Sequence, residues 1–291
     1  MTIEEAEKIV DEYEFKSVTT PDEDFMLTEA MEFLIDKTKD TKWMVRLGGY
    51  YYDRKDFDLA LKYYEMADSF GDRWAPEGLG YIWYYGRTGE KDYGKAFHYY
   101  EKAAVYGSLN SAMKIADMYK NGYYVEKDYD KYVEMIENLY TQTKHHRNCG
   151  EKVGIFVRLA RIRKEQGDSD EALRLFLDAK SMLADELEFN QFFGDLNVMK
   201  WLTEDLYTVT EFDRADFDLY DLYYLMREPV KVRFRYNDEE HIAEAVKEEG
   251  GIAVSFDGKW FRTIDDFFRS AELNGERLPA LYYRLYGFEV M

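Results

Sequence analysis

The hydrophobic positions of this chain recur in one arrangement four times between residues 56 and 179. In the first copy Ala60, Tyr64 and Ala67 are spaced by four and then three residues, which places them on one side of an α-helix. The second and third copies each begin 36 residues after the one before, and the fourth begins 40 residues later. An aspartate begins each copy, where its carboxylate caps the first turn of a helix. The four copies are residues 56–67, 92–103, 128–139 and 168–179.

A second helix is predicted before each copy, because a large apolar residue followed by Gly or Ala recurs there. These pairs are Leu47 and Gly48, Leu79 and Gly80, Ile115 and Ala116, and Leu159 and Ala160. A small residue at this place lets a neighbouring helix approach closely. Each unit is therefore predicted to be a helix–turn–helix hairpin that buries its apolar side only by stacking on its neighbours.

Helices are also predicted on both sides of the repeats. Residues 3–15 and 21–38 are amphipathic, and Thr20 and Glu23 form a capping box with Pro21 at the first helical position. Residues 183–226 have apolar residues at helical spacing, so we expect further helices that close the stack.

The pattern changes to strict alternation at residues 230–236, which is typical of a half-exposed strand. Residues 252–256 and 259–261 flank Asp257 and Gly258, so they predict a hairpin with a tight turn. Residues 241–247 are compatible with a helix or a strand, and we favour a strand that pairs with residues 230–236.

The remaining C-terminal segment predicts a mixture of turns and helices. Thr263 followed by Asp266 predicts the start of a helix that runs to about Ala271. A turn is expected at Asn274 and Gly275, and a last helix is expected to begin at Pro279 and to end at Gly287.

The predicted fold class is therefore mainly α, an α-α superhelix of helix–turn–helix repeats with a small C-terminal α/β module. The domains are N-terminal capping helices, the repeats, C-terminal capping helices and the α/β module. Their expected bounds are residues 1–41, 42–180, 181–228 and 229–291.

The composition and charge bear on the kind of partner. The 291 residues include 39 Lys and Arg against 59 Asp and Glu, a net charge of −20. Nucleic acid binding requires a basic surface, so this balance argues against it. The acidity either keeps the protein soluble or attracts a basic partner. Residues 229–291 carry a net charge of only −3, and the basic side of the first strand could dock on the acidic helices.

The chain has one cysteine, Cys149, which cannot form an internal disulfide. The acidic N-terminus has no apolar segment of the kind found in signal peptides, and no apolar run approaches the roughly 18 residues of a membrane span. We expect a cytoplasmic protein that does not contact membranes.

Motifs for catalysis and cofactors are missing from the sequence. It has no phosphate-binding glycine loop, no dinucleotide fingerprint, no nucleophile elbow and no paired-histidine zinc helix. His145, His146 and Cys149 lie close together, but their spacing matches no standard metal site and indicates an ordinary polar linker. No catalytic residue, metal or cofactor is predicted.

The second copy resembles the Sel-one-like repeat (SLR) family, a relative of the tetratricopeptide repeat. The residues that carry this resemblance are Leu79, Gly80, Trp83, Gly86, Asp92, Lys95, Ala96, Tyr99, Tyr100, Lys102, Ala103, Ala104 and Gly107. The third copy keeps much of the pattern, although Tyr132 replaces the small alanine. The first and fourth copies have a shorter turn and are similar to plain tetratricopeptide units. The resemblance covers about residues 42–180, and none is recognised for the C-terminal module.

This resemblance implies that the first helix of each hairpin lines a concave surface that holds a peptide or a partner domain. The implied partner-binding residues are Tyr52, Glu77, Tyr81, Tyr84, Asn110, Asp117, Lys120, Arg161 and Lys164. Tyr81 and Tyr84 share a helix face, where they either anchor a partner or pack against adjacent repeats. The surface is expected to change from acidic and aromatic to basic at Arg161 and Lys164.

The sequence thus predicts a non-enzymatic adaptor that binds a protein or a peptide. One alternative is a regulatory protein that senses a peptide or small ligand and uses the C-terminal module as its output. A third is an enzyme with an unrecognised site in that module. Its residues would be Trp260, Phe261, Asp265 and Asp266, although the two aromatic residues are expected to fill the core. The sequence identifies neither the partner nor the oligomeric state.

Overall fold

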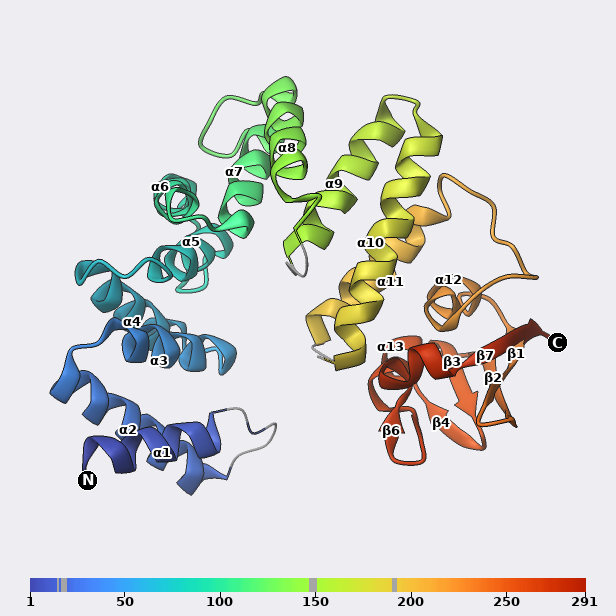
Figure 1. The fold of residues 1–291 in the computed structure, drawn as a ribbon, viewed down its shortest axis with the longest axis horizontal. Coiled ribbons are helices and arrows are strands. Elements are labelled where there is room, and N and C mark those ends of the chain that lie inside the picture. Colours follow the sequence, from blue (N-terminus) through green and yellow to red (C-terminus); the bar gives the residue numbers. More distant parts are fainter. Residues whose placement is uncertain (15, 17–19, 147–150, 190–192) are drawn as a thin grey trace. The chain divides into compact units, whose positions relative to one another are not determined.

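The computed structural model describes residues 1–14, 16, 20–146, 151–189 and 193–291, and it divides into the two units 1–135 and 136–291 (Figure 1). The fold is mainly α, with helix–turn–helix hairpins and a small C-terminal α/β module, as the sequence predicts. Cys149, which the sequence places near His145 and His146, lies outside the described residues.

The first unit contains the N-terminal helices and most of the repeats. Its helices are α1 (Ile3–Tyr13), α2 (Pro21–Thr38), α3 (Thr41–Asp53), α4 (Phe57–Ser69), α5 (Ala75–Tyr85), α6 (Tyr93–Val105), α7 (Leu109–Asn121) and the beginning of α8 (Tyr129–Thr143). Helix α3 packs against α4 and helix α5 against α6, as the two members of a hairpin. The N-terminal pair α1 and α2 packs together in the same way.

The predicted helix caps are confirmed. Each capping aspartate accepts a hydrogen bond from the backbone N–H three residues later, at 2.9–3.3 Å; these residues are Asp56, Asp92, Asp128 and Asp168. Thr20 and Glu23 form the predicted capping box at the start of α2, with hydrogen bonds of 2.8 and 3.3 Å. Satisfying these otherwise unpaired N–H groups fixes where each helix begins.

Small residues allow the paired helices to approach, also as predicted. A Cβ atom on Gly48 of α3 would lie 2.9 Å from the ring of Tyr64 in α4, and a Cβ atom on Gly80 of α5 would lie closer still to the ring of Tyr100 in α6. Such distances are far below ordinary contact, so only glycine admits these rings. The repeated pairing of a glycine with a tyrosine therefore sets the separation of the helices in both hairpins.

The second unit continues with longer helices. They are the rest of α8, then α9 (Glu151–Glu165), α10 (Ser169–Phe189), α11 (Phe193–Leu206), the short 3₁₀ helix η1 (Leu219–Asp221) and α12 (Leu222–Leu225). Helix α10 runs without interruption through the domain boundary expected at residue 180. Its apolar stripe continues through Leu183, Ala184 and Leu187, which are all buried, so nothing in the packing marks an end there.

The C-terminal module is an antiparallel sheet with the strand order β4-β3-β2-β1-β7. Its strands are β1 (Val230–Tyr236), β2 (Glu239–Glu248), β3 (Gly251–Phe256), β4 (Lys259–Phe261) and β7 (Tyr286–Val290). Residues 241–247 are a strand that pairs with β1, as favoured from the sequence. Helix α13 (Ile264–Ser270) packs against β3 and β4. The turns at Asn274 and at Asp257 are confirmed as hairpins, the first of them joining β5 (Glu272–Leu273) to β6 (Glu276–Arg277).

The last predicted helix is confirmed at its start, as a 3₁₀ helix, but its predicted end at Gly287 is wrong. Pro279 lies in the 3₁₀ helix η2 (Leu278–Arg284), and Gly287 lies inside strand β7 instead of ending a helix. Strand β7 pairs with the edge of β1, where Phe288 stacks on Phe234 with ring centroids 5.0 Å apart. The free edge of β1 and the alternating apolar residues of the C-terminus favour a strand over a helix.

The cations of the first strand, which were expected to dock on the acidic helices, have partners within their own sheet. Arg233 pairs with Glu240 and Glu289, and Lys231 pairs with Glu244, so these cations bind carboxylates of their own sheet. Opposite charges on neighbouring strands stabilise the sheet.

A buried ion pair instead connects α10 to the segment before the module. The ammonium of Lys180 lies 2.6 Å from Asp221 and 2.8 Å from Asp218, and Tyr282 of η2 donates to Asp218 at 2.9 Å. Burial raises the pKa of Asp221, the charge of Asp218 raises it further, and Lys180 opposes both. This cluster fixes η1 and η2 to one face of α10.

Candidate functional site: an aromatic pocket on the first helices

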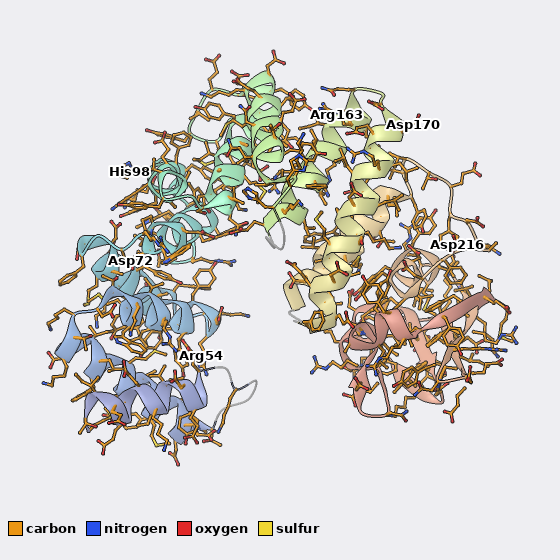
Figure 2. All side chains as sticks on the ribbon, in the orientation of Figure 1. Arg54, Asp72, His98, Arg163, Asp170 and Asp216 are labelled. Carbon is orange, nitrogen blue, oxygen red and sulfur yellow. The ribbon has the colours of Figure 1, made fainter. Side chains whose placement is uncertain are left out.

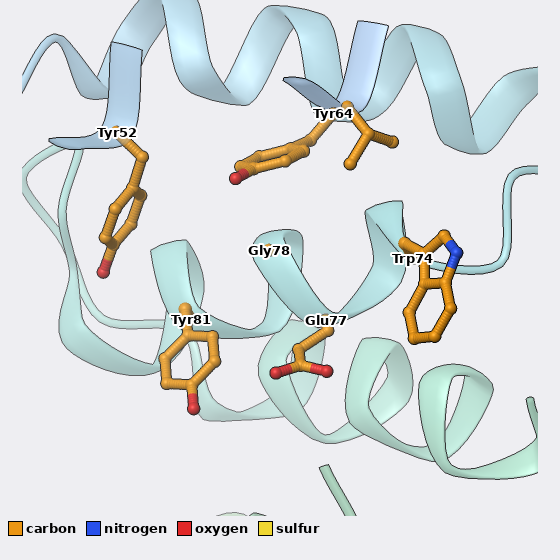
Figure 3. A pocket seen from close by; sticks show the side chains of 7 residues that line it. Tyr52, Tyr64, Trp74, Glu77, Gly78 and Tyr81 are labelled. Carbon is orange, nitrogen blue, oxygen red and sulfur yellow. The ribbon is translucent and has the colours of Figure 1, made fainter. Parts of the chain in front are cut away.

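The first unit contains a cavity of about 310 Å³ between two successive hairpins (Figure 3). It is lined by Val45, Tyr52, Tyr64, Trp74, Glu77, Gly78 and Tyr81. We call these seven residues the aromatic pocket. Three of them, Tyr52, Glu77 and Tyr81, were predicted to bind a partner, and the structure brings them together from the first helices α3 and α5.

Tyr64 forms the inner wall of the aromatic pocket. Its ring lies between α3 and α5, where Cβ atoms on Gly48 and Gly78 would approach it to 2.9 and 2.7 Å, respectively. Burial raises the pKa of the Tyr64 hydroxyl, and the charge of Asp53 raises it further. The hydroxyl therefore stays protonated at neutral pH, and the wall is uncharged.

Trp74 forms the outer wall, in the turn that precedes α5. Asp72, which is buried and is labelled in Figure 2, accepts hydrogen bonds from the backbone N–H groups of Trp74 at 2.7 Å and of Ala75 at 2.9 Å. These bonds hold the turn, while the indole remains 55% exposed. An exposed tryptophan on a fixed turn is a typical anchor in protein interfaces.

Glu77 is the only charged side chain in the lining, and the next repeat holds its carboxylate. The hydroxyl of Ser108 donates to it at 2.7 Å, and the amide of Asn110 donates at 3.4 Å. Asn110, another predicted residue, thus supports the aromatic pocket from α7 without lining it. Because the hydroxyl and the amide are neutral donors, they hold the carboxylate in place without compensating its negative charge.

Tyr81 extends the aromatic surface beyond the cavity. Its ring stacks on Tyr85 with centroids 6.0 Å apart and meets Tyr100 edge-on at 5.9 Å. Tyr85 is 39% exposed, and the ammonium of Lys114 donates to its hydroxyl at 2.7 Å. Aromatic pairs of this geometry hold the rings in fixed orientations.

Tyr84 lies in a different environment from Tyr81. It contacts Tyr93, Tyr100 and Tyr123 within the core between α5, α6 and α7. Burial raises the pKa of Tyr84, and the nearby charge of Asp117 raises it further. Of the two tyrosines predicted to share a helix face, Tyr81 therefore lines the aromatic pocket, whereas Tyr84 packs between neighbouring repeats.

The other predicted residues lie outside the aromatic pocket. The ammonium of Lys120 lies 4.9 Å from the centre of the Tyr132 ring, and the backbone oxygen of Asp117 accepts from Asn121 at 2.7 Å. In the second unit Arg161 binds Asp205 at 2.5 Å, and Lys164 donates to Thr208 at 2.7 Å. Both predicted cations, Arg161 and Lys164, therefore bind α11 and the residues after it.

The residues of the enzyme alternative lie in different environments. Trp260 is 60% exposed instead of filling the core, whereas Phe261 packs edge-on against Phe267 at 5.7 Å, as expected. Asp265 pairs with Lys200 of α11 at 3.0 Å. Among the described residues, no group of three or more His, Cys, Asp or Glu side chains could hold a metal ion. No described helix is long and apolar enough to cross a membrane.

Two walls of the aromatic pocket, Tyr64 and Trp74, are not among the site residues predicted from the sequence. The helical pattern places Tyr64 in the buried stripe of its helix, and Trp74 precedes a helix instead of lying on one. Trp74 stands 36 residues before Asn110, at the equivalent repeat position. Aligning the turns as well as the helices would have indicated it.

Comparisons with known proteins give distant structural similarities. No family model matches the chain, and no curated protein matches it significantly. A Sel1 repeat protein from Oxalobacter formigenes is 19% identical with a TM-score of 0.49, and the match covers 69% of this chain and 86% of that one. The protective antigen c5321 of uropathogenic Escherichia coli, which displays an SLR fold, is 16% identical with a TM-score of 0.43, covering 65% and 46% of the two chains.

A third similar structure is a Rap protein complexed with competence and sporulation factor, at 12% identity and a TM-score of 0.43, covering 70% of this chain and 64% of that one. At these identities a likeness concerns the fold alone. The chain's own series of capped hairpins with glycine–tyrosine contacts defines its repeat fold. The protein is therefore a helical-repeat protein built from paired helix–turn–helix hairpins.

Proposed function

We propose that the first unit binds an extended segment of a partner protein or peptide on its first helices, with the aromatic pocket as the anchor point. The observation that carries this proposal is the cavity itself, which joins residues of α3, α4 and α5 into one aromatic wall. Concave aromatic sites with few polar groups are typical of ligand and peptide recognition. We propose a non-enzymatic adaptor in the cytoplasm, with no nucleic acid or membrane as its partner.

The construction of the aromatic pocket supports binding over mere packing. Trp74 is exposed although Asp72 fixes its backbone, so the fold holds a large apolar side chain at the surface. Glu77 is likewise held in one orientation by Ser108 and Asn110. Side chains that are already ordered lose little conformational entropy when a partner binds.

A peptide library displayed on phage tests this proposal. Peptides selected on the intact protein should bind the Trp74→Ala variant at least tenfold more weakly, because the variant loses an anchor of the aromatic pocket. Trp201→Ala is the matched control, since Trp201 is 57% exposed on α11 in the second unit, and it should bind normally. If the selected peptides bind the Trp74→Ala variant as well as the control, the aromatic pocket is not the binding site.

A further inference from the structure

We propose that the aromatic pocket receives the cationic side chain of a lysine or arginine in an extended partner segment. This inference rests on the proposed function and specifies the chemistry of its anchor. The juxtaposition that carries it is four aromatic side chains and a single carboxylate in the lining of one cavity: Tyr52, Tyr64, Trp74 and Tyr81 line it together with Glu77, which lies between Tyr81 and Trp74 in Figure 3.

The aromatic faces supply the first part of the recognition. The face of an aromatic ring carries negative potential, and it attracts an ammonium or guanidinium group within about 6 Å of its centre. The rings come from α3, from α4, and from α5 with the turn before it, so a side chain that enters the cavity meets more than one of them. The volume of about 310 Å³ corresponds to roughly ten water molecules, which leaves room for a long flexible side chain.

The charges supply the second part. Glu77 lies within the lining, and Asp53 is close enough to raise the pKa of the Tyr64 hydroxyl. An acidic side chain of a partner would be repelled by the negative charge of Glu77. An apolar side chain would shield the Glu77 carboxylate from water without supplying a compensating charge, which is unfavourable. The first unit as a whole has 28 Asp and Glu against 18 Lys and Arg between residues 1 and 135.

The protein's own cations already use the same rings outside the cavity. Arg73 lies 4.6 Å from the Trp74 ring centre, Arg87 lies 5.7 Å from that of Tyr52, and Lys114 lies 5.6 Å from that of Tyr81. None of these three cations lines the aromatic pocket. The rings therefore attract cations in this fold, and the cavity contains a carboxylate with no cation of the chain's own in the lining.

A peptide is a better occupant than a free cation. The wall continues from the cavity onto the exposed indole of Trp74 and onto the stacked rings of Tyr81 and Tyr85. A chain that places one side chain in the aromatic pocket covers this surface with its neighbouring residues, whereas a small free cation leaves it in water. Burial of that additional apolar surface favours the peptide.

The probes are four tripeptides of the form acetyl-Gly-X-Gly-amide, in which X is arginine, lysine, citrulline or norleucine. Binding is followed by NMR through the indole N–H signal of Trp74, assigned by its loss in Trp74→Phe. The arginine or lysine peptide should shift this signal saturably. The uncharged citrulline and norleucine peptides should bind about 3- to 30-fold more weakly, the range expected for a cation on aromatic faces. Tetramethylammonium should bind more weakly than the better cationic peptide.

Glu77→Gln tests the role of the charge while it keeps the shape of the side chain. It should weaken the cationic peptides severalfold and leave the norleucine peptide unchanged, and Glu101→Gln, an exposed glutamate on α6, is the matched control. Equal binding of the charged and uncharged peptides would overturn the inference and leave the proposed function intact. An absence of any shift of the Trp74 signal by the cationic peptides would also overturn it. If tetramethylammonium binds as tightly as the better cationic peptide, the occupant of the aromatic pocket is a small cation and the inference of a peptide is overturned.

Discussion

Two adjacent glycines of α3 should respond in opposite directions to substitution by alanine. A Cβ atom at position 48 would lie 2.9 Å from the Tyr64 ring, whereas at position 49 its nearest neighbour is the Tyr64 hydroxyl at 3.6 Å. The first distance is a clash and the second is an ordinary contact. In Gly48→Ala the ring cannot retreat, because Gly78 of α5 lies against it as well.

The magnitudes follow from two opposing effects. Alanine in place of glycine inside a helix stabilises by about 0.5–1 kcal/mol, because it restricts the unfolded chain. Overpacking a filled interior costs about 1–3 kcal/mol. Gly49→Ala should therefore raise the free energy of unfolding by up to about 1 kcal/mol, and Gly48→Ala should lower it by roughly 0.5–2 kcal/mol.

Urea denaturation combined with hydrogen exchange of the α3 and α4 amides measures both variants within the first unit. The same substitution in a Tyr64→Leu background provides the check, because the smaller side chain removes the clash. There, Gly48→Ala should become neutral or stabilising. If Gly48→Ala destabilises equally with and without the Tyr64 ring, or if both single variants are stabilising, the proposed basis of the helix spacing is incorrect.

Further predictions concern buried charges and tyrosines. Lys180→Met should destabilise the second unit by about 3–5 kcal/mol in urea denaturation, because it leaves Asp221 buried without its cation. Lys200→Met removes a half-exposed pair and should cost less than about 1 kcal/mol; equal losses would refute the distinction. Burial raises the pKa of Tyr100 and Tyr223, so both stabilise the fold below the usual tyrosine pKa and lose that contribution as pH rises above it. The NMR signals of the Tyr100 and Tyr223 rings should therefore change to those of tyrosinate only together with the loss of circular dichroism above about pH 10, and ionisation of either ring in the folded protein would contradict the burial.

The local parts of the fold could be predicted from the sequence. Capping aspartates, the Thr20 box and the hairpin at Asp257 depend on residues within a few positions of each other, and the structure confirms them. The glycine–tyrosine contacts were partly predictable, because the 36-residue repeat places a small residue before each aromatic stripe.

The failures have a common physical origin in partners that are distant along the chain. The C-terminal residues form a strand because the edge of β1 is available, and the sequence near Gly287 does not contain that information. Arg161 was assigned to an exposed surface because its partner Asp205 lies 44 residues away. The aromatic pocket was found only in part, since Trp74 and Tyr64 belong to different elements that meet when two hairpins stack.

Site-specific photo-crosslinking in the source cell tests the central claim most directly. A photoreactive phenylalanine analogue replaces Tyr81 or Tyr52 in the aromatic pocket, or Tyr106 as a control that is 47% exposed in the turn after α6. The account predicts that the two pocket positions capture the same partner, that the crosslinks fall on one segment of it, and that position 106 captures it far less. Equal capture of that partner from all three positions, or no capture from either pocket position, would contradict the claim.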